Sequence, residues 1–250
     1  MRASSVRKSQ QAPFAWESAA ATSKGNVRQH NEDAVIELPE IGLWAVADGM
    51  GGHQAGDVAS AAIATALASI RRHAQPSVLI DEVEDRLSAV NDRLYKESLA
   101  RGAVIGSTVA MLVALERHAV ALWAGDSRIY RARGGELTQL TRDHSEVQQM
   151  IDDGTLAPEE ARQHASANVI TRAVGGAAEL ALDLQLIELA DDDAYLLCTD
   201  GLYRELSPST LSRSLQRGKP GKTCDKLIGL ALAGECRDNV SAVVVQFVAS

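Results

Sequence analysis

The chain has 250 residues, and that length fits one large domain because single cores stop growing near ~250–300 residues. Hydrophobic residues make up 46% of it, which is an ordinary globular composition and excludes a disordered chain. The formal net charge of -8 argues against a nucleic-acid-binding protein, which needs a basic surface to displace counterions.

The N-terminal residues 1–13 are polar and end at Pro13, so we expect a flexible tail followed by one domain over residues 14–250. The tail carries positive charges with no apolar segment behind them, which does not fit a secretory signal. The longest apolar stretch, Val58 to Ile70, is too short to span a bilayer. We therefore expect a buried helix there and no membrane insertion.

The apolar pattern along the chain predicts strands, then helices, strands, helices and a last strand. The predicted strands cover Ala34–Leu38, Leu43–Ala47, Ser107–Leu115, Ala119–Ala124, Ser127–Ala132, Leu182–Leu186, Tyr195–Cys198 and Val240–Val248. The predicted helices cover Val58–Arg72, Asp81–Ala100, Pro208–Leu215 and Lys222–Ala233. Gly134-Gly135 predicts a hairpin turn, and residues 143–176 predict an excursion with short helices. Because βαβ alternation is absent, antiparallel sheets with helices outside fit better than a doubly wound parallel sheet.

Two of these segments carry a one-sided apolar pattern. In the helix Asp81–Ala100, apolar residues at helical spacing predict one buried face, made of Val83, Leu87, Val90, Leu94 and Leu99. In the strand Leu182–Leu186, three leucines alternate with Asp183 and Gln185, which predicts a half-buried strand.

Four aspartates lie where an apolar strand is predicted to begin or end, namely Asp48, Asp126, Asp200 and Asp238. For any one of them a turn is the simpler interpretation, because Asp-Gly is a standard turn pair. If all four converge, two carboxylates ~4 Å apart repel by ~4 kcal/mol at an effective dielectric of ~20. Convergence therefore requires cations, and all-oxygen ligands suit Mg²⁺ or Mn²⁺ rather than zinc.

Two segments near Asp48 raise the question of phosphate binding. Arg28 is either an ordinary surface arginine or a fork that donates two charged hydrogen bonds to a phosphate. The glycine-rich segment 49–54 follows a predicted strand and precedes a helix, as a nucleotide loop does. However, Gln54 stands where the dinucleotide motif has Gly, and no Gly-Lys-Ser/Thr is present, so the sequence disfavours nucleotide binding.

Eight short motifs follow one another between about Ala19 and Phe247. They are Gly25-Asn26-Val27-Arg28 with Asn31-Glu32-Asp33-Ala34, Val46–His53, Gly106-Ser107-Thr108, Gly125–Arg128, Thr141–Ser145, Ile170–Gly175, Thr199–Leu202 and Arg237–Val240. In this order they resemble the bacterial branch of the type 2C metal-dependent protein phosphatases (PPM). One such motif would be weak evidence, but eight in order across almost the whole chain are strong evidence.

The resemblance implies an α+β fold, a four-layer sandwich of two packed antiparallel β-sheets flanked by α-helices. It implies a protein serine/threonine phosphatase with two tightly bound Mn²⁺ or Mg²⁺ ions and a weaker third, in which a water or hydroxide bridging the two ions attacks phosphorus. The partners would be phosphorylated proteins, targets of a Ser/Thr protein kinase, and the enzyme would be monomeric. Residues 143–176 resemble the mobile flap beside the site.

The resemblance also assigns roles to single residues. Asp48 would bridge two metal ions, with the Gly49 carbonyl on one and Asp200 and Asp238 on the other. Asp126 would help to hold the third ion. Asp33 would hold water bound to the metals, and Arg28 would grip the phosphate.

One departure concerns the proton donor. Animal members of the family carry a His after the Asp-Gly pair, proposed as the general acid, and this chain has Met50 there. His53 lies nearby in sequence, although a capping or packing role suits it at least as well. A metal-bound water is the other candidate for donating the proton to the leaving alkoxide.

Two alternative functions compete with this interpretation. Cys198 to Arg204 spells Cys-x5-Arg, the motif of a thiolate phosphatase, but Leu197, Glu205 and Asp200 depart from that pattern, and a buried strand cysteine is the simpler reading. A phosphopeptide-binding pseudophosphatase would lack a metal ligand, and none is missing here. The three cysteines form no C-x-x-C pair, so we expect no disulfide framework and a cytoplasmic location.

Overall fold

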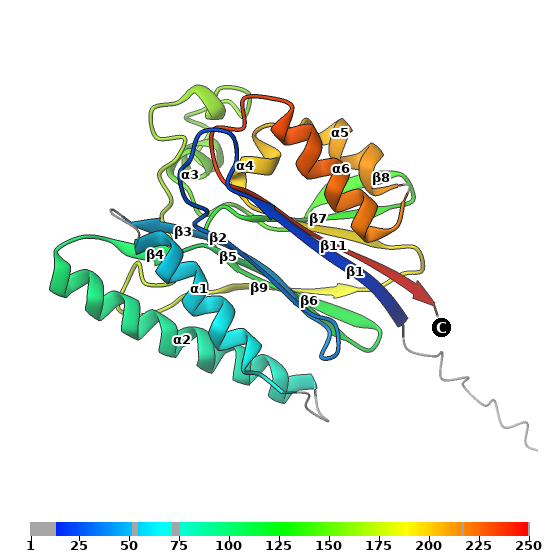
Figure 1. Ribbon diagram of the computed structural model, residues 1–250, viewed down its shortest axis with the longest axis horizontal. Helices are drawn as coiled ribbons and strands as arrows, with labels where there is room; N and C mark the ends of the chain where they lie inside the picture. Colours follow the sequence, from blue (N-terminus) through cyan, green and yellow to red (C-terminus); the bar gives the residue numbers. More distant parts are fainter. Residues whose placement is uncertain (1–13, 52–54, 72–75, 217, 250) are drawn as a thin grey trace, which may run out of the picture.

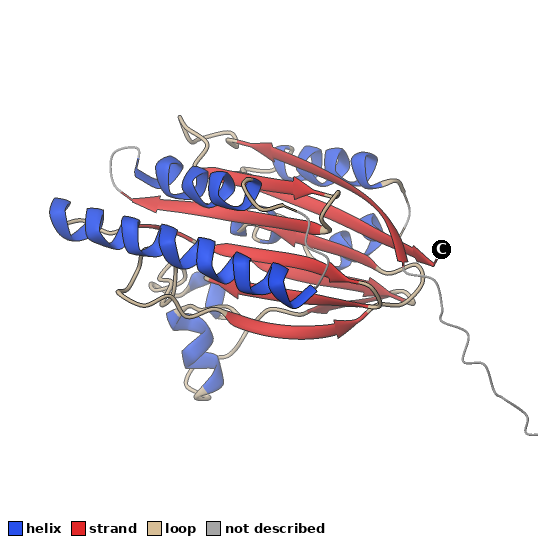
Figure 2. Ribbon diagram, turned by 90° about the horizontal axis from the view of Figure 1, so that it is seen from below, coloured by secondary structure: helices blue, strands red, loops and turns tan. Residues whose placement is uncertain are grey.

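The computed structural model describes residues 14–51, 55–71, 76–216 and 218–249. The tail expected over residues 1–13 and the candidate residue His53 lie outside these ranges. Two antiparallel sheets pack face to face, and helices cover both outer faces (Figure 1; Figure 2). The four-layer α+β sandwich predicted from the sequence is therefore confirmed.

The two sheets contain all the named strands. The five-stranded sheet has the order β1 (Phe14–Ser23), β11 (Val240–Ala249), β10 (Ala194–Cys198), β7 (Arg128–Arg133), β8 (Glu136–Gln139). The six-stranded sheet has the order β2 (Asp33–Leu38), β3 (Leu43–Gly51), β5 (Val109–Leu115), β6 (His118–Ala124), β9 (Asp183–Glu188), with β4 (Ile105–Ser107) beside β3. Neighbouring strands are antiparallel throughout the described chain.

The helices divide between the two outer layers. The six-stranded sheet is covered by α1 (Ala55–Ala68) and α2 (Pro76–Arg101), and the five-stranded sheet by α4 (Asp200–Tyr203), α5 (Pro208–Leu215) and α6 (Pro220–Leu232) (Figure 1). The predicted excursion contains α3 (Glu146–Asp152) and the 3₁₀ turn η1 (Ala161–Gln163). No helix among the described residues has both the length and the apolar character needed to cross a bilayer.

Side-chain alternation explains why the central strands are apolar without interruption. In β3, Leu43 and Ala45 face the helices, while Trp44 and Val46 face the other sheet. Both faces of such a strand are buried, so both sets of side chains must be apolar. Between the sheets, the Phe247 ring meets the Trp44 ring edge-on, with the centroids 6.1 Å apart. Three apolar clusters hold the sandwich together. One lies between the two sheets, and one lies under each helical layer.

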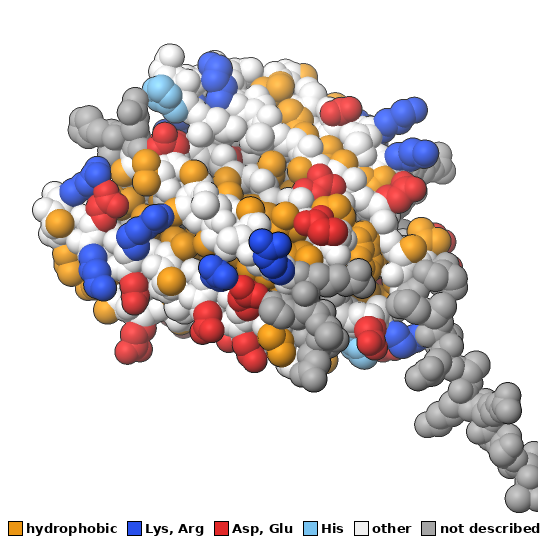
Figure 3. Space-filling model, turned by 60° about the horizontal axis from the view of Figure 1, so that its bottom comes forward, with side chains coloured by type: hydrophobic (Ala, Val, Ile, Leu, Met, Phe, Trp, Pro, Cys, Tyr) orange, Lys and Arg blue, Asp and Glu red, His pale blue; other side chains and the backbone are white. Residues whose placement is uncertain are grey.

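Three apolar side chains do not lie where their patterns predicted. Leu99, expected on the buried face of α2, is 66% exposed. Leu184 and Leu186 are 52% and 61% exposed. Both lie in β9, the edge strand of its sheet, where neighbouring side chains cover them from the β6 side only. On the face seen in Figure 3, acidic and basic side chains are interspersed, with hydrophobic side chains between them.

Candidate active site

One cavity of about 290 Å³ gathers residues from the two sheets, a helix start and the excursion. Of the residues predicted for the site, its lining includes Arg28, Asp48, Gly49, Asp126, Asp200 and Asp238. The four aspartates predicted near strand ends therefore do share one cavity. Asp33 lies beside them, paired with Asp48 across the β2–β3 ladder.

The glycines that follow Asp48 and Asp200 correct the interpretation of Asp-Gly as a turn. Gly49 continues β3, and Gly201 lies in α4. A Cβ on Gly49 would lie 2.0 Å from the Gly56 carbonyl oxygen, and one on Gly201 would lie 2.0 Å from the Asn239 carbonyl oxygen. Neither glycine has a positive φ, so close backbone approach is what requires them. This approach packs β3 against the start of α1, and α4 against the residue that precedes β11.

Asp48 is held by a residue whose role the sequence did not reveal. The Asp48 N–H donates to Thr108 Oγ1 at 3.0 Å, and the Thr108 N–H donates to the Asp48 carbonyl at 2.9 Å. Thr108 also exchanges a 2.7 Å hydrogen bond with Ser127. Burial raises the pKa of Asp48 well above its ordinary value, and the charges of Asp33 and Asp200 raise it further. The only sequence sign of Thr108 was its place in one of the family motifs.

Asp33 is buried and only partly satisfied. Its Oδ2 accepts hydrogen bonds from Thr199 Oγ1 at 2.8 Å and Ser241 Oγ at 2.6 Å, while its Oδ1 is buried without a partner. Burial raises the pKa of Asp33 to about 7, the two hydroxyl hydrogen bonds oppose that rise, and the charges of Asp200 and Asp238 add to it. The carboxylate is thus oriented by two hydroxyls and presents one free oxygen.

Asp126 and Asp200 approach the cavity from a turn and from a helix start. Asp126 lies between β6 and β7, and burial raises its pKa to about 7, with Asp200 and Asp143 adding to the effect. Asp200 begins α4, and its Oδ1 is buried without a partner. Burial also raises the pKa of Asp200, while Arg204 opposes the rise. Such shifts in mutually repelling carboxylates mean that the positive charge of the neighbouring arginines does not balance the negative charge of the site.

Arg28 lies at the exposed side of the cavity. Its Nη2 donates to Asp238 Oδ2 at 2.8 Å, and the two side chains are 52% and 41% exposed. Asn239 holds the loop that carries Arg28, since its Nδ2 donates to the Lys24 and His30 carbonyls at 3.0 and 2.9 Å. Sequence reasoning did not single out Asn239, although it follows Asp238 within a family motif.

The residues present suit hard divalent cations in chemistry, because they offer carboxylate and carbonyl oxygens and unpartnered buried atoms. Within the described ranges, no three acidic, His or Cys side chains are already arranged as a metal-binding group. Arginines occupy part of the carboxylate surface instead, with Arg28 on Asp238 and Arg204 on Asp200. A cation entering here must compete with these two arginines.

Cys198 does not have the surroundings of a nucleophile. It lies in β10, fully buried in the apolar cluster under α4 and α6, and burial raises the pKa of its thiol. The guanidinium of Arg204 contacts Asp200 and Asp126 rather than the thiol. The structure therefore argues against the Cys-x5-Arg alternative, since the thiolate is the form that attacks phosphorus.

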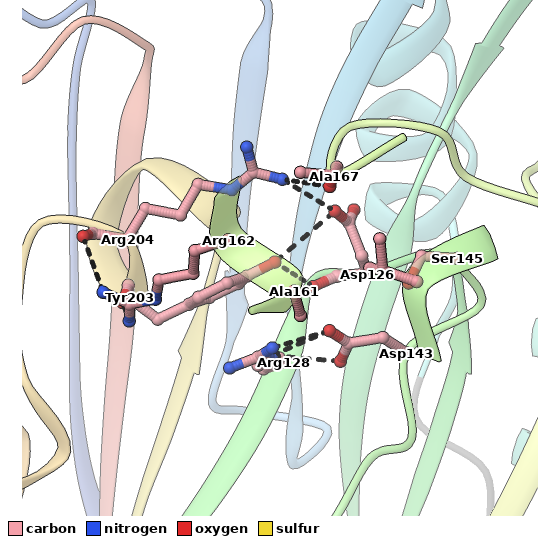
Figure 4. A pocket seen from close by; sticks show the side chains of 10 residues that line it. Asp126, Arg128, Asp143, Ser145, Ala161, Arg162, Ala167, Tyr203 and Arg204 are labelled. Carbon is pink, nitrogen blue, oxygen red and sulfur yellow. Dashed lines mark hydrogen bonds and ion pairs between the residues drawn. The ribbon is translucent and has the colours of Figure 1, made fainter. Parts of the chain in front are cut away.

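The excursion contributes to the cavity as the family resemblance implied. Asn168 and Ile170 line it; Ile170 begins one of the family motifs, and no motif contains Asn168. A second cavity of about 260 Å³ lies beneath the same segment and shares Asp126 with the first (Figure 4). Arg204 lines this second cavity, whereas the sequence suggests a role for it only in the Cys-x5-Arg motif.

Comparisons with known proteins place this geometry in a family. The model of a family described as protein phosphatase 2C matches residues 21–220. The serine/threonine protein phosphatase PstP of Mycobacterium tuberculosis is 36% identical over 232 residues, which cover 92% of this chain. This chain spans about half the length of that relative, 45%.

Two solved structures extend the likeness over nearly the whole chain. PppA, described as a key regulatory component of T6SS in Pseudomonas aeruginosa, has a TM-score of 0.87 at 38% identity and covers 94% of this chain and 99% of its own. The catalytic domain of PstP, in complex with two manganese ions, has a TM-score of 0.83 at 34% identity, with coverage of 94% and 99%. The chain therefore belongs to the protein phosphatase 2C family.

Proposed function

We propose that residues 14–250 form the catalytic domain of a metal-dependent protein phosphatase that hydrolyses phosphoserine and phosphothreonine. The observation that carries the proposal is a single cavity in which four aspartates face an exposed arginine, in a chain of the protein phosphatase 2C family. Carboxylates that repel one another suit divalent cations, and the arginine suits a phosphate.

We assign the metal ligands to Asp48, the Gly49 carbonyl, Asp200 and Asp238, which would hold two Mn²⁺ or Mg²⁺ ions. The support is the oxygen-only donor set, together with the two manganese ions in the PstP catalytic domain. When bound, such ions act as Lewis acids and lower the pKa of water towards neutrality.

The chain's own residues would bind and orient the reactants. Arg28 would bind the phosphoryl oxygens through its exposed guanidinium, which reaches the cavity from the β1–β2 loop. Asp33 would orient the attacking water through its unpartnered Oδ1, because its other oxygen is fixed by two hydroxyls. Met50 lines the cavity without a proton to give, so the leaving alkoxide takes its proton from another donor.

We further propose that the substrates are proteins phosphorylated by a Ser/Thr kinase and that the protein acts in the cytoplasm. The three described cysteines are free and buried, which suits a reducing compartment. We also propose that the protein acts as a monomer.

Matched phosphopeptides test this function directly. With Mn²⁺ present, peptides that differ only in the phosphorylated residue are expected to show faster turnover of phosphoserine and phosphothreonine than of phosphotyrosine. Phosphate release is measured for each peptide, and Asp48→Asn serves as the control for contaminating phosphatases. Faster turnover of the phosphotyrosine peptide would contradict the proposal.

Arg28→Ala is expected to lower kcat/KM by at least ~10-fold, mainly through a higher KM. A charged hydrogen bond contributes ~1.5–3 kcal/mol, and this side chain is proposed to bind phosphate. Arg86→Ala is the matched control, since Arg86 is an exposed arginine paired with Glu82 on α2, away from the cavity. Steady-state kinetics decide the outcome, and an unchanged kcat/KM would remove Arg28 from the site. Mn²⁺ binding is expected to persist in both variants.

A further inference from the structure

Arg204 extends from the end of α4 towards the carboxylate of Asp126 (Figure 4). Its Nε lies 3.1 Å from Asp200 Oδ2, and its Nη2 lies 3.7 Å from Asp126 Oδ2. Two mutually repelling carboxylates therefore share one guanidinium. Arg204 is permanently charged at any physiological pH.

The same guanidinium is anchored by the excursion. Its Nη2 donates to the Ala167 carbonyl at 3.1 Å, and its Nη1 donates to Asn168 Oδ1. Arg162, in η1, donates to the Tyr203 carbonyl at 2.8 Å and strengthens the connection between this segment and α4. With a backbone oxygen, an amide and two carboxylates around it, the Arg204 head group has a defined position.

Arg28 provides an internal comparison. Its side chain is 52% exposed and contacts one carboxylate, that of Asp238, so a cation or a phosphate can displace it at little cost. The Arg204 side chain is 31% exposed and contacts Ala167 and Asn168 in addition to two carboxylates. Displacing it would break contacts to Ala167 and Asn168 as well as those to the aspartates.

We propose that Arg204 takes the place of a third divalent cation by neutralising Asp126 and Asp200 from within the chain. The family resemblance led us to expect a weaker third ion at Asp126. A dication between the same two carboxylates would meet the positive guanidinium at close range, where the repulsion is weakly screened. The chain therefore binds two divalent cations. This inference rests on the proposed metal-dependent function.

The test is a Mn²⁺ titration of the purified protein, in which free Mn²⁺ is measured by its electron paramagnetic resonance signal. The wild-type protein is expected to bind two ions. Arg204→Met keeps the length of the side chain and removes its charge, so it is expected to gain a third site. That site should bind at least about tenfold more tightly than any weak binding seen in the wild type.

Three variants make the assignment specific. Arg204→Lys keeps the charge and is expected to retain two sites. The double variant Arg204→Met with Asp126→Asn is expected to lose the gained site. Arg162→Met is the matched control, because Arg162 lines the same second cavity and donates to backbone carbonyls of Tyr203 and Arg204. It is expected to leave the stoichiometry at two.

The outcomes separate this inference from the proposed function. A third site of equal affinity in the wild type and in Arg204→Met, or two sites in both, would overturn the proposed role of Arg204. The proposed function would stand in either case. No Mn²⁺ bound to either protein would overturn the proposed function and this inference with it. Matching near-ultraviolet circular dichroism verifies folding, and Arg204→Gln, which retains an amide donor without charge, provides the same comparison if Arg204→Met does not fold.

Discussion

Asp200→Asn is expected to remove nearly all phosphatase activity, while Cys198→Ser, two residues away, keeps most of it. Asn preserves the shape of Asp200 but removes the charge proposed to hold a dication. Loss of several kcal/mol of transition-state stabilisation lowers kcat/KM by about 100-fold or more. In contrast, Cys198 is fully buried in β10 and contributes its volume to the apolar cluster beneath α4.

Cys198→Ser should therefore cost stability without touching the chemistry. A buried hydroxyl without a partner costs about 1–3 kcal/mol. In a domain of this size each kcal/mol lowers the melting temperature by roughly 2–4 °C. Kinetics are measured below the melting transition of both variants, after circular dichroism has shown that they fold. A folded, inactive Cys198→Ser beside an active Asp200→Asn would mean that the two-metal proposal is wrong and that the thiol is the nucleophile.

Removal of divalent cations is the second change with a large expected effect. Exhaustive EDTA treatment followed by desalting should reduce turnover to background, and added Mn²⁺ or Mg²⁺ should restore it. The physical reason is the charge balance of the site. Burial and mutual repulsion raise the pKa values of Asp33, Asp48, Asp126 and Asp200, and among the described residues the cation that opposes this rise at Asp126 and Asp200 is Arg204. Full turnover by the EDTA-treated protein would refute metal dependence.

A thermal shift gives a readout that does not depend on activity. An ion that binds only the folded state at 100 times its Kd stabilises that state by about 2.7 kcal/mol. For a chain of this length the melting temperature should rise by roughly 5–10 °C when Mn²⁺ is added. Asp48→Asn is the control, because it removes the residue proposed to bridge both ions, and most of the shift should disappear. An equal shift in that variant would place the bound ions elsewhere.

The sequence by itself determined the elements whose signals are local. Helix α5 begins and ends as predicted, at Pro208 and Leu215, because Ser207 caps it by accepting the Thr210 N–H and proline suits the first turn. Strands buried on both faces, such as β3, are recognisable from their uninterrupted apolar residues. The eight motifs determined the family and the candidate residues, whose individual roles remain predictions.

Only the tertiary structure decided features that depend on distant partners. Strand β1 carries Glu17 and several small residues and was not predicted, and it forms by pairing along its whole length with β11, more than 200 residues later. Likewise, the apolar pattern of β9 cannot tell that the strand lies at an edge, which leaves Leu184 exposed. The position of Arg204 between Asp126 and Asp200 also depends on partners that are distant in the sequence. An arginine side chain is long and flexible, and which carboxylates it contacts depends on how α4, the β6–β7 turn and residues 167–168 are packed together.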